Sequence, residues 1–341
     1  MPQKLRRPPL VLASLLLATQ AMASQAGFRQ TQIPAPTPGA APITVALYYP
    51  TQAQERTIAM GPFSPQVAMS AKPDDKVKGL IVLSHGTGGS ELGHSSLAEA
   101  LSRHGYLVAA LRHPGDNWQD RSLLKTSAER YFSERPQQAS HVITALLRDP
   151  EWKDRIAADA RGPRVGALGH SAGGYTVLAL AGARPDMQHM TTHCQDHNAD
   201  DPIFCSLGDA ARPSGNPVPM AAPAPALADV RVRAVVAMAP VGAAFGARSF
   251  AQVQLPVLVY QADRDRFLVP RFHSEWIGRN FAAAKLQRVP NAWHFAFMDS
   301  PSMAVLTEDG DIAANPPGFD RPALLRQLQR ELPAFFDEAW R

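Results

Sequence analysis

The decapeptide GALGHSAGGY (166–175) constrains the fold of this chain more than any other segment. An apolar run typical of a strand (164–169) leads into it, and a run with helical spacing (172–183) follows. Within it, the pattern G-x-S-x-G places Ser171 on a strained turn between a strand and a helix. Such a turn requires glycines, because backbone segments approach the serine closely. The segment therefore predicts an α/β protein in which Ser171 lies at the end of a strand.

Strand-type and helix-type segments alternate along most of the chain. Strands are predicted at 43–49, 79–86, the first part of 106–116, 164–169, 232–240, 256–263 and 285–290, and helices at 95–105, 134–147, 172–183, 271–284 and 321–340. In the helix at 134–147, Pro136 falls in the first turn, where proline is tolerated. This alternation predicts one α/β domain (24–341) with a mostly parallel sheet covered by helices on both faces. Ligands of such sheets bind beyond the carboxyl ends of the strands.

The first 23 residues have the composition of a secretory signal peptide. Lys4, Arg6 and Arg7 precede a short apolar run, and AMA (21–23) provides small residues for a cleavage site. The apolar run is shorter than the roughly 20 residues that a bilayer requires. We therefore expect a soluble protein exported to the periplasm or the medium, without stable membrane insertion. Removal of the three basic residues lowers the formal net charge from +4 to +1, which predicts no nucleic-acid partner.

Residues 184–229 interrupt the alternation of strands and helices. The segment is rich in proline and lacks a clear period. Long irregular segments inside compact domains are usually functional, so we expect a cap over the strand ends. Cys194 and Cys205 lie in it, and export favours a disulfide between them over two free thiols. The run DHNADD (196–201) starts like a calcium loop, but Asp201 stands where that loop needs glycine, so no metal is predicted.

A serine hydroxyl is a weak nucleophile and needs a histidine base that a carboxylate orients. With a G-x-S-x-G turn, the three residues follow the order serine, acid, histidine. Two histidines, His273 and His294, follow the last core strands. His273 falls within a predicted helix and is expected to face solvent, whereas His294 lies in a loop among aromatic residues. We therefore predict His294 as the base.

Several motifs together resemble those of the α/β-hydrolases. They are LSHGTGGS (83–90), LSRHGYLVAALRHPGDN (101–117), GHSAGGY (169–175), the insertion with its cysteines, DRFLVPRF (265–272) and WHFAF (293–297). The chain is most similar to the bacterial group of predicted dienelactone hydrolases, which is related to platelet-activating-factor acetylhydrolases. The resemblance spans about residues 43–298. It implies an α/β-hydrolase fold with a cap inserted after the nucleophile helix.

The acid and the oxyanion donors follow with help from this resemblance. In related hydrolases the acid lies a short, regular distance after the proline that opens its strand, and counting from Pro256 gives Asp265. A second count, from the turn that ends in V-P, misses Asp265 by one residue; the first count decides, and Asp263 is left as an exposed turn residue. The backbone N–H groups of Ala172, which follows the nucleophile, and of Thr87, chosen by similarity, are predicted to bind the oxyanion.

Four further residues are predicted to line the substrate pocket. His113 and Trp118 belong to RHPGDNWQD (112–120), which follows the strand beside the oxyanion loop. The alternative for this segment is a Pro-Gly turn with an aspartate cap. For Tyr175 and Trp293, the alternative is packing in the core.

These residues predict hydrolysis of a carboxylic ester through an acyl-enzyme, with no cofactor. Dienelactone hydrolases proper use a cysteine nucleophile, so Ser171 favours general ester hydrolysis over dienelactone opening. A small-molecule ester with a moderately hydrophobic group is the expected substrate. A serine peptidase or amidase on the same fold and a non-catalytic binding protein are the alternatives. The oligomeric state is not predicted.

Overall fold

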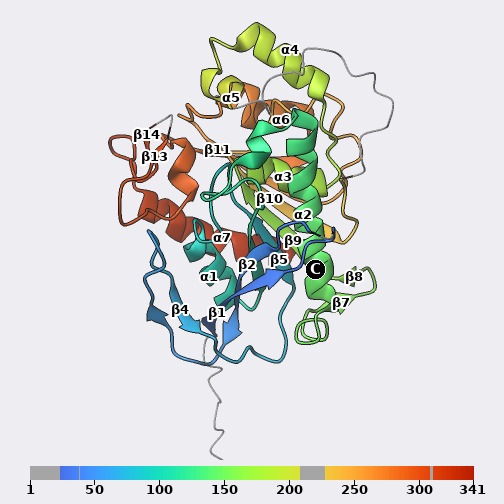
Figure 1. Ribbon diagram of the computed structural model, residues 1–341, viewed down its shortest axis with the longest axis vertical. Helices are drawn as coiled ribbons and strands as arrows, with labels where there is room; N and C mark the ends of the chain where they lie inside the picture. The colour runs from blue at the N-terminus through green and yellow to red at the C-terminus, as the bar shows by residue number, and fades with distance from the viewer. Residues whose placement is uncertain (1–23, 38, 208–226, 308–309) are drawn as a thin grey trace, which may run out of the picture.

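The computed structural model describes residues 24–341 except 38, 208–226 and 308–309 (Figure 1). The predicted signal peptide and the middle of the predicted insertion lie outside these residues. Within the described ranges, the helices are all too short or too polar to cross a lipid bilayer.

Ten strands of the described chain form one sheet in the order β12-β11-β10-β9-β5-β6-β2-β1-β4-β3. From β12 to β6 all neighbours pair in parallel, whereas β2 is antiparallel to both β6 and β1. The strands are β1 Gln25–Ile33, β2 Ile43–Thr51, β3 Arg56–Thr57, β4 Gln66–Met69, β5 Leu80–Ser84, β6 Leu107–Arg112, β9 Val165–His170, β10 Val232–Met238, β11 Val257–Ala262 and β12 Ala284–Val289. Two small hairpins stand apart from the sheet: β7 Ala158–Asp159 with β8 Gly162–Pro163, and β13 Leu306–Thr307 with β14 Gly310–Asp311.

Helices cover both faces of the sheet and create two hydrophobic cores (Figure 1). One core packs α2, α3 and α6 against the sheet, and the other packs α1 and α7 against the opposite face. The central strands β5, β9, β10 and β11 are buried along their whole length, which explains their continuous apolar sequences. The helices are α1 Ser95–Arg103, α2 Ala128–Arg148, α3 Ala172–Leu180, α4 Met187–His197, α5 Pro202–Ser206, α6 Ser274–Asn280 and α7 Arg321–Ala339, with short 3-10 turns η1 Ser122–Lys125, η3 Pro270–Phe272 and η4 His294–Phe297.

Helix α2 begins earlier than the sequence pattern predicts, so Pro136 is an interior residue rather than a first-turn residue. The side chain of Ser127 caps the helix by accepting from the N–H of Arg130. Pro136 has no N–H for the carbonyl group of Phe132, four residues earlier. The hydroxyl group of Tyr175 donates to that carbonyl oxygen at 2.9 Å and replaces the missing bond. A tertiary contact from α3 therefore makes the interior proline tolerable.

The described part of the insertion forms α4 and α5, which a disulfide joins between Cys194 and Cys205. The predicted disulfide is confirmed. In Figure 1 both helices lie next to α6, at the end of the molecule opposite β1 and β4. Phe204 of α5 lies beside Thr87 and Ala172, which follow β5 and β9, so this described part lies beyond the carboxyl ends of those strands.

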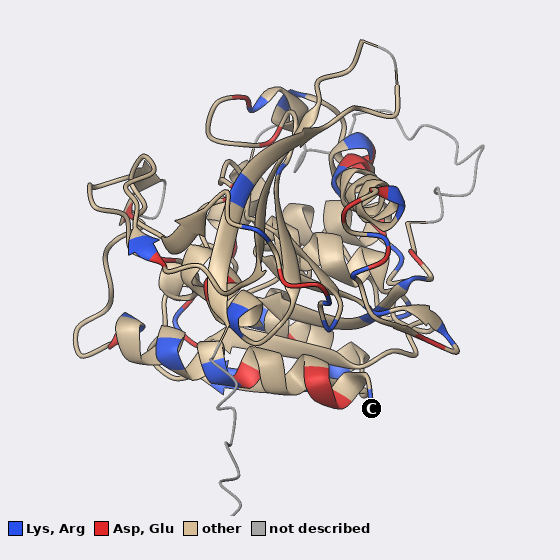
Figure 2. Ribbon diagram, turned by 90° about the horizontal axis from the view of Figure 1, so that it is seen from below, with Lys and Arg blue, Asp and Glu red and all other residues tan. Residues whose placement is uncertain are grey.

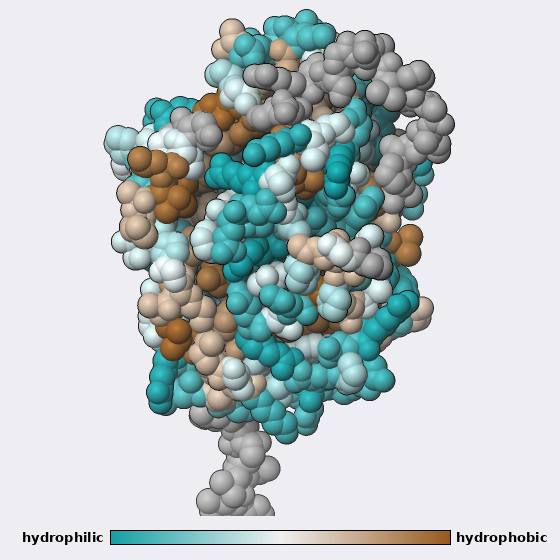
Figure 3. Space-filling model, viewed as in Figure 1, coloured by the Kyte–Doolittle hydropathy of each residue, from teal (hydrophilic) through white to brown (hydrophobic). Residues whose placement is uncertain are grey.

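The surface mixes acidic and basic residues, as Figure 2 shows along α7. In the view of Figure 3, hydrophobic residues gather over the hairpin β13–β14, where Leu306 is exposed and the nearby Met303 and Val305 are exposed as well. This hairpin lies outside both hydrophobic cores.

Candidate active site

The predicted nucleophile lies on the turn between β9 and α3. Ser171 has a φ of 58° and directly precedes Ala172, the first residue of α3. A Cβ atom on Gly169 would lie 2.1 Å from the carbonyl oxygen of Gly173, and one on Gly173 would lie 1.9 Å from that of Ser84. Both positions therefore require glycine. A serine with positive φ is strained, and backbone strain of this kind clusters at functional sites.

His294 and Asp265 form a buried hydrogen-bonded pair. His294 Nδ1 and Asp265 Oδ2 are 2.7 Å apart, and both side chains are almost fully buried. The second carboxylate oxygen, Oδ1, accepts the N–H groups of Phe267 and Leu268 at 2.9 and 2.8 Å. When Nδ1 of a neutral imidazole donates to this carboxylate, Nε2 is the acceptor. A general base needs this tautomer.

The loop that carries His294 lies against the end of β9. His170, which precedes Ser171, donates from Nε2 to the carbonyl oxygen of His294 at 2.9 Å. The ring of His294 stacks on Phe267, with 4.9 Å between ring centroids. Burial lowers the pKa of His170 well below its ordinary value, so this ring stays neutral. Ser171, Asp265 and His294 thus follow β9, β11 and β12 at the same edge of the sheet.

The loop after β5 passes directly beside Ser171. A Cβ atom on Gly86 would lie 3.5 Å from Ser171 Oγ. The next residue, Thr87, contributes to the wall of a cavity together with Ala172. The two residues predicted to supply oxyanion donors therefore line the same cavity.

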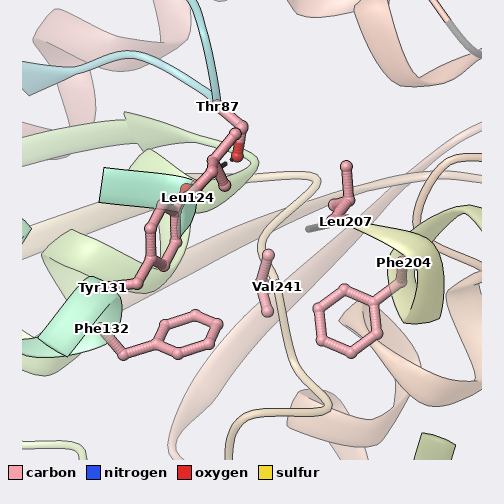
Figure 4. Close-up of a pocket in the computed structure, with 8 residues that line it drawn as sticks. Thr87, Leu124, Tyr131, Phe132, Phe204, Leu207 and Val241 are labelled. Atoms are coloured by element: carbon pink, nitrogen blue, oxygen red, sulfur yellow. Dashed lines mark hydrogen bonds between the residues drawn. The ribbon is translucent and has the colours of Figure 1, made fainter. Parts of the chain in front are cut away.

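An apolar cavity of about 20 Å³ lies beside these two residues (Figure 4). This volume is close to the minimum that one water molecule needs. The insertion contributes two of its walls, since Phe204 belongs to α5 and Leu207 follows it. The lining residues are Thr87, Leu124, Tyr131, Phe132, Ala172, Phe204, Leu207 and Val241.

The four residues predicted to line a pocket are not among the residues that line this cavity. His113 and Tyr175 are fully buried, and Tyr175 bonds to α2 as described above. Trp118 is 59% exposed. Trp293 packs against the guanidinium group of Arg266, 4.5 Å from the ring centroid. Their role in substrate binding stays a prediction.

The prediction that His273 faces solvent is wrong, because its side chain is only 1% exposed. Its Nε2 lies 2.8 Å from Asp201 Oδ2, and its Nδ1 accepts the backbone N–H of Gly242 at 3.0 Å. The same carboxylate oxygen of Asp201 lies 2.8 Å from His193 Nε2 in α4. Burial opposes the charge of Asp201, but the attraction and hydrogen bonds of His273 and His193 hold its pKa below the ordinary value. Asp201 thus connects α4 to His273, which follows β11, and through His273 to Gly242, which follows β10.

Two groups of side chains have the spacing of a metal site within the described residues. In the first, His193 with Cys194 and Cys205, the disulfide removes both thiolates that would bind a metal. In the second, His193, Asp201 and His273, a ligating histidine should donate its other ring N–H to an acceptor. His273 instead accepts a backbone N–H at Nδ1, which leaves the proton on Nε2, the atom that faces Asp201. The hydrogen bonds therefore favour a structural role for this cluster over metal binding.

Sequence reasoning did not identify Asp201, Tyr131 or Arg135 as residues near the site. Tyr131 and Arg135 lie in α2, and the predicted helix, which begins at residue 134, includes Arg135 but not Tyr131. Their importance depends on contacts with residues 15 to 51 positions away. No local signal marks such contacts.

The chain has an α/β fold of the α/β-hydrolase type, in which Ser171, Asp265 and His294 follow β9, β11 and β12. It is similar to a solved structure of a ferulic acid esterase from Streptomyces cinnamoneus, with a TM-score of 0.61, 19% sequence identity, and coverage of 94% of this chain and 92% of that chain. At this identity the likeness establishes the fold alone.

Other comparisons add no narrower assignment. No protein-family model matches the chain. No curated protein matches it either. The finer resemblance to the dienelactone hydrolase group therefore stays a prediction.

Proposed function

We propose that this protein is a serine hydrolase that cleaves carboxylic esters, with Ser171 as nucleophile, His294 as base and Asp265 as the acid that orients His294. The observation that carries the proposal is the buried pair between His294 Nδ1 and Asp265 Oδ2, held beside the strained turn of Ser171. A neutral His294 that donates from Nδ1 to Asp265 has Nε2 as its acceptor, as a general base requires. A histidine of this kind next to a serine can act as the base that activates the serine as a nucleophile.

The proposed mechanism uses these three residues. His294 Nε2 takes the proton of Ser171 as Oγ attacks the ester carbonyl carbon, and it returns the proton to the leaving alcohol. Water then attacks the acyl-enzyme with the same nitrogen as base, which releases the carboxylic acid and restores Ser171. Asp265 stays ionised throughout and stabilises the imidazolium that forms in each half-reaction. The reaction needs no cofactor in this scheme.

The developing oxyanion is bound by the backbone N–H groups of Ala172 and Thr87. Ala172 lies at the first position of α3, where the helix dipole adds positive potential. Removal of one such donor typically costs about 3 kcal/mol of transition-state stabilisation. The apolar walls next to these donors suit the acyl part of an ester better than a charged group. The structural neighbour is a ferulic acid esterase, which supports the same reaction class.

A fluorophosphonate probe and a substrate panel test the proposal. The purified protein should bind the probe at Ser171 and hydrolyse p-nitrophenyl esters, and Ser171→Ala should abolish both. Peptide anilides should be cleaved far more slowly than esters. Faster cleavage of anilides would assign the site to a peptidase or amidase, and absence of both labelling and turnover would indicate a binding protein.

We also propose export to the periplasm or the medium. The support is the sequence of residues 1–23 and the disulfide, which is typical of oxidising compartments. Expression of the full chain in a Gram-negative host, followed by cell fractionation and N-terminal sequencing, should give a protein that starts after Ala23. An uncleaved cytoplasmic product would contradict the proposal.

A further inference from the structure

A buried ion pair lies beneath the loop that follows β5. Arg135 in α2 and Asp116 in the loop after β6 have fully buried side chains and are directly hydrogen-bonded. A buried ion pair adds little net stability, because desolvation of both charges offsets most of their attraction. The contacts of this pair suggest a different reason for its presence.

Both partners hold the backbone of the loop. Asp116 Oδ1 accepts the N–H of Gly88 at 2.8 Å. Arg135 Nη2 donates to the carbonyl oxygen of His85 and, at 3.3 Å, to Ser84 Oγ. The pair is thus hydrogen-bonded to the loop backbone before and after Thr87.

Tyr131 holds Thr87 itself. The Tyr131 hydroxyl donates to Asp116 Oδ2 at 2.8 Å, and it lies 2.8 Å from Thr87 Oγ1. Since its proton is used on Asp116, its oxygen accepts the proton of Thr87. The side chain of Thr87 is therefore tied to the same ion pair.

Arg135 also reaches the helix that starts at the nucleophile. Its Nε donates to Thr176 Oγ1 at 3.3 Å, and that hydroxyl donates to the carbonyl oxygen of Ala172 at 2.9 Å. One guanidinium group therefore joins the loop of Thr87 to the first residue of α3. These are the two segments that supply the proposed oxyanion donors.

We propose that Arg135, with Asp116 and Tyr131, is a positioning residue that fixes the distance and orientation between the N–H groups of Thr87 and Ala172. The inference rests on the proposed function. The loop contains Gly86, Gly88 and Gly89, and Gly88 has a φ of 64°. Glycines allow the loop to pass close to Ser171 but leave the backbone many alternative conformations. Oxyanion donors act only when they are preorganised, so the side chains outside the loop supply the rigidity.

The main test replaces Arg135 with lysine. Arg135→Lys keeps the charge, but one ammonium group cannot reproduce the planar fork that bonds Asp116, His85 and Thr176 together. We expect kcat for a p-nitrophenyl ester to fall about 100-fold, as for a misplacement on the order of 1 Å, while KM changes little. The affinity for a trifluoromethyl ketone, whose adduct with Ser171 places an oxyanion between the donors, should fall by a similar factor. Tyr131→Phe, which keeps the ion pair, should show both effects at a smaller magnitude.

Arg231→Lys is the matched control. Arg231 bonds to Asp229 and to Ser140 and Thr144 of the same helix, toward the opposite end of α2. The Arg231→Lys substitution should leave kcat and the inhibitor affinity unchanged even if it lowers the melting temperature. Equal losses in the Arg231 and Arg135 variants would overturn the inference, as would Arg135 and Tyr131 variants with normal kcat and inhibitor affinity. The wild-type protein tests the proposed function: if that function is wrong, the wild type neither hydrolyses esters nor binds the probe at Ser171. The variants are compared only with active wild type, so they test the positioning role separately.

Discussion

Two aspartates, Asp263 and Asp265, follow β11, and their surroundings differ sharply. Asp265 accepts two backbone N–H groups and lies 2.7 Å from His294 Nδ1. Asp263 is partly exposed, bonds to Gln261 and lies 3.6 Å from Arg288. Only one of the two carboxylates can orient the proposed base.

Asp265→Asn should therefore lower kcat by roughly four orders of magnitude, because an amide stabilises the wrong tautomer of His294. Asp263→Asn should leave kcat within a factor of about two or three, since a surface carboxylate contributes little. Steady-state kinetics on a p-nitrophenyl ester measure both. A large loss in the Asp263 variant with little loss in the Asp265 variant would reverse the assignment.

Phe204 narrows the cavity beside Ala172 and Thr87 from the insertion side. Phe204→Ala should raise the ratio of kcat/KM for a hexanoate ester to that for an acetate ester by roughly tenfold. Removal of the ring leaves space for a few more methylene groups of the acyl chain. Phe272→Ala is a matched control, because Phe272 packs on His193 near the insertion but does not line the cavity. An unchanged chain-length profile in Phe204→Ala would place the acyl group elsewhere.

At the scale of elements, the sequence pattern predicts what depends on local periodicity and misses what depends on distant contacts. The strand before Ser171 and the helix after it are predicted within a few residues. The start of α2 is not, because Tyr175 supplies the bond that Pro136 cannot make. The buried state of His273 is not predicted either, because its partner Asp201 lies 72 residues away in the insertion. The same limit applies to the site. Local sequence patterns mark Ser171 and the two cysteines, whereas no local pattern marks the hydrogen bonds that Arg135 makes with distant residues.

The disulfide should matter for the element that it joins. Replacement of both Cys194 and Cys205 by serine should lower the free energy of unfolding by about 2–3 kcal/mol, because a short loop is no longer closed in the unfolded chain. KM should rise as Phe204 loses its fixed position. Guanidinium unfolding and ester kinetics with and without reductant measure both effects. A reductant should reproduce them in the wild type and change nothing in the double variant; an effect of reductant on the double variant would point to another cause.

At the scale of the whole molecule, the parallel strands gather segments that are far apart in the sequence at one edge. The loops after β5, β9, β11 and β12 supply the candidate site, although more than 200 residues separate Thr87 from His294. A fold alone says little about substrate, which is decided by the loops and the insertion.

Burial of histidines should make the whole molecule sensitive to acid. Burial lowers the pKa of His85 to about 4 and of His94 to about 3, and it lowers those of His113 and His170 as well. Between these values and the ordinary value near 6.5, the unfolded chain binds protons that the folded chain does not. Their contribution to stability is therefore complete above pH 6.5 and is lost as the pH falls toward 4. Burial raises the pKa of Glu99 to about 7 and of Asp299 to about 6, which gives stability at low pH and opposes the histidines.

Burial also lowers the pKa of His189. Since five histidines oppose two carboxylates, the free energy of unfolding should fall between pH 6.5 and pH 4.5. Urea unfolding at a series of pH values measures it. His94→Leu should reduce the slope of this fall by up to about 1.4 kcal/mol per pH unit, the value for one proton. The substitution breaks no hydrogen bond, because neither ring nitrogen of His94 has a partner in the described chain. Glu99→Gln should steepen the fall, because it removes an opposing group. A stability that is constant or rises on acidification in this range would show that the histidines do not dominate.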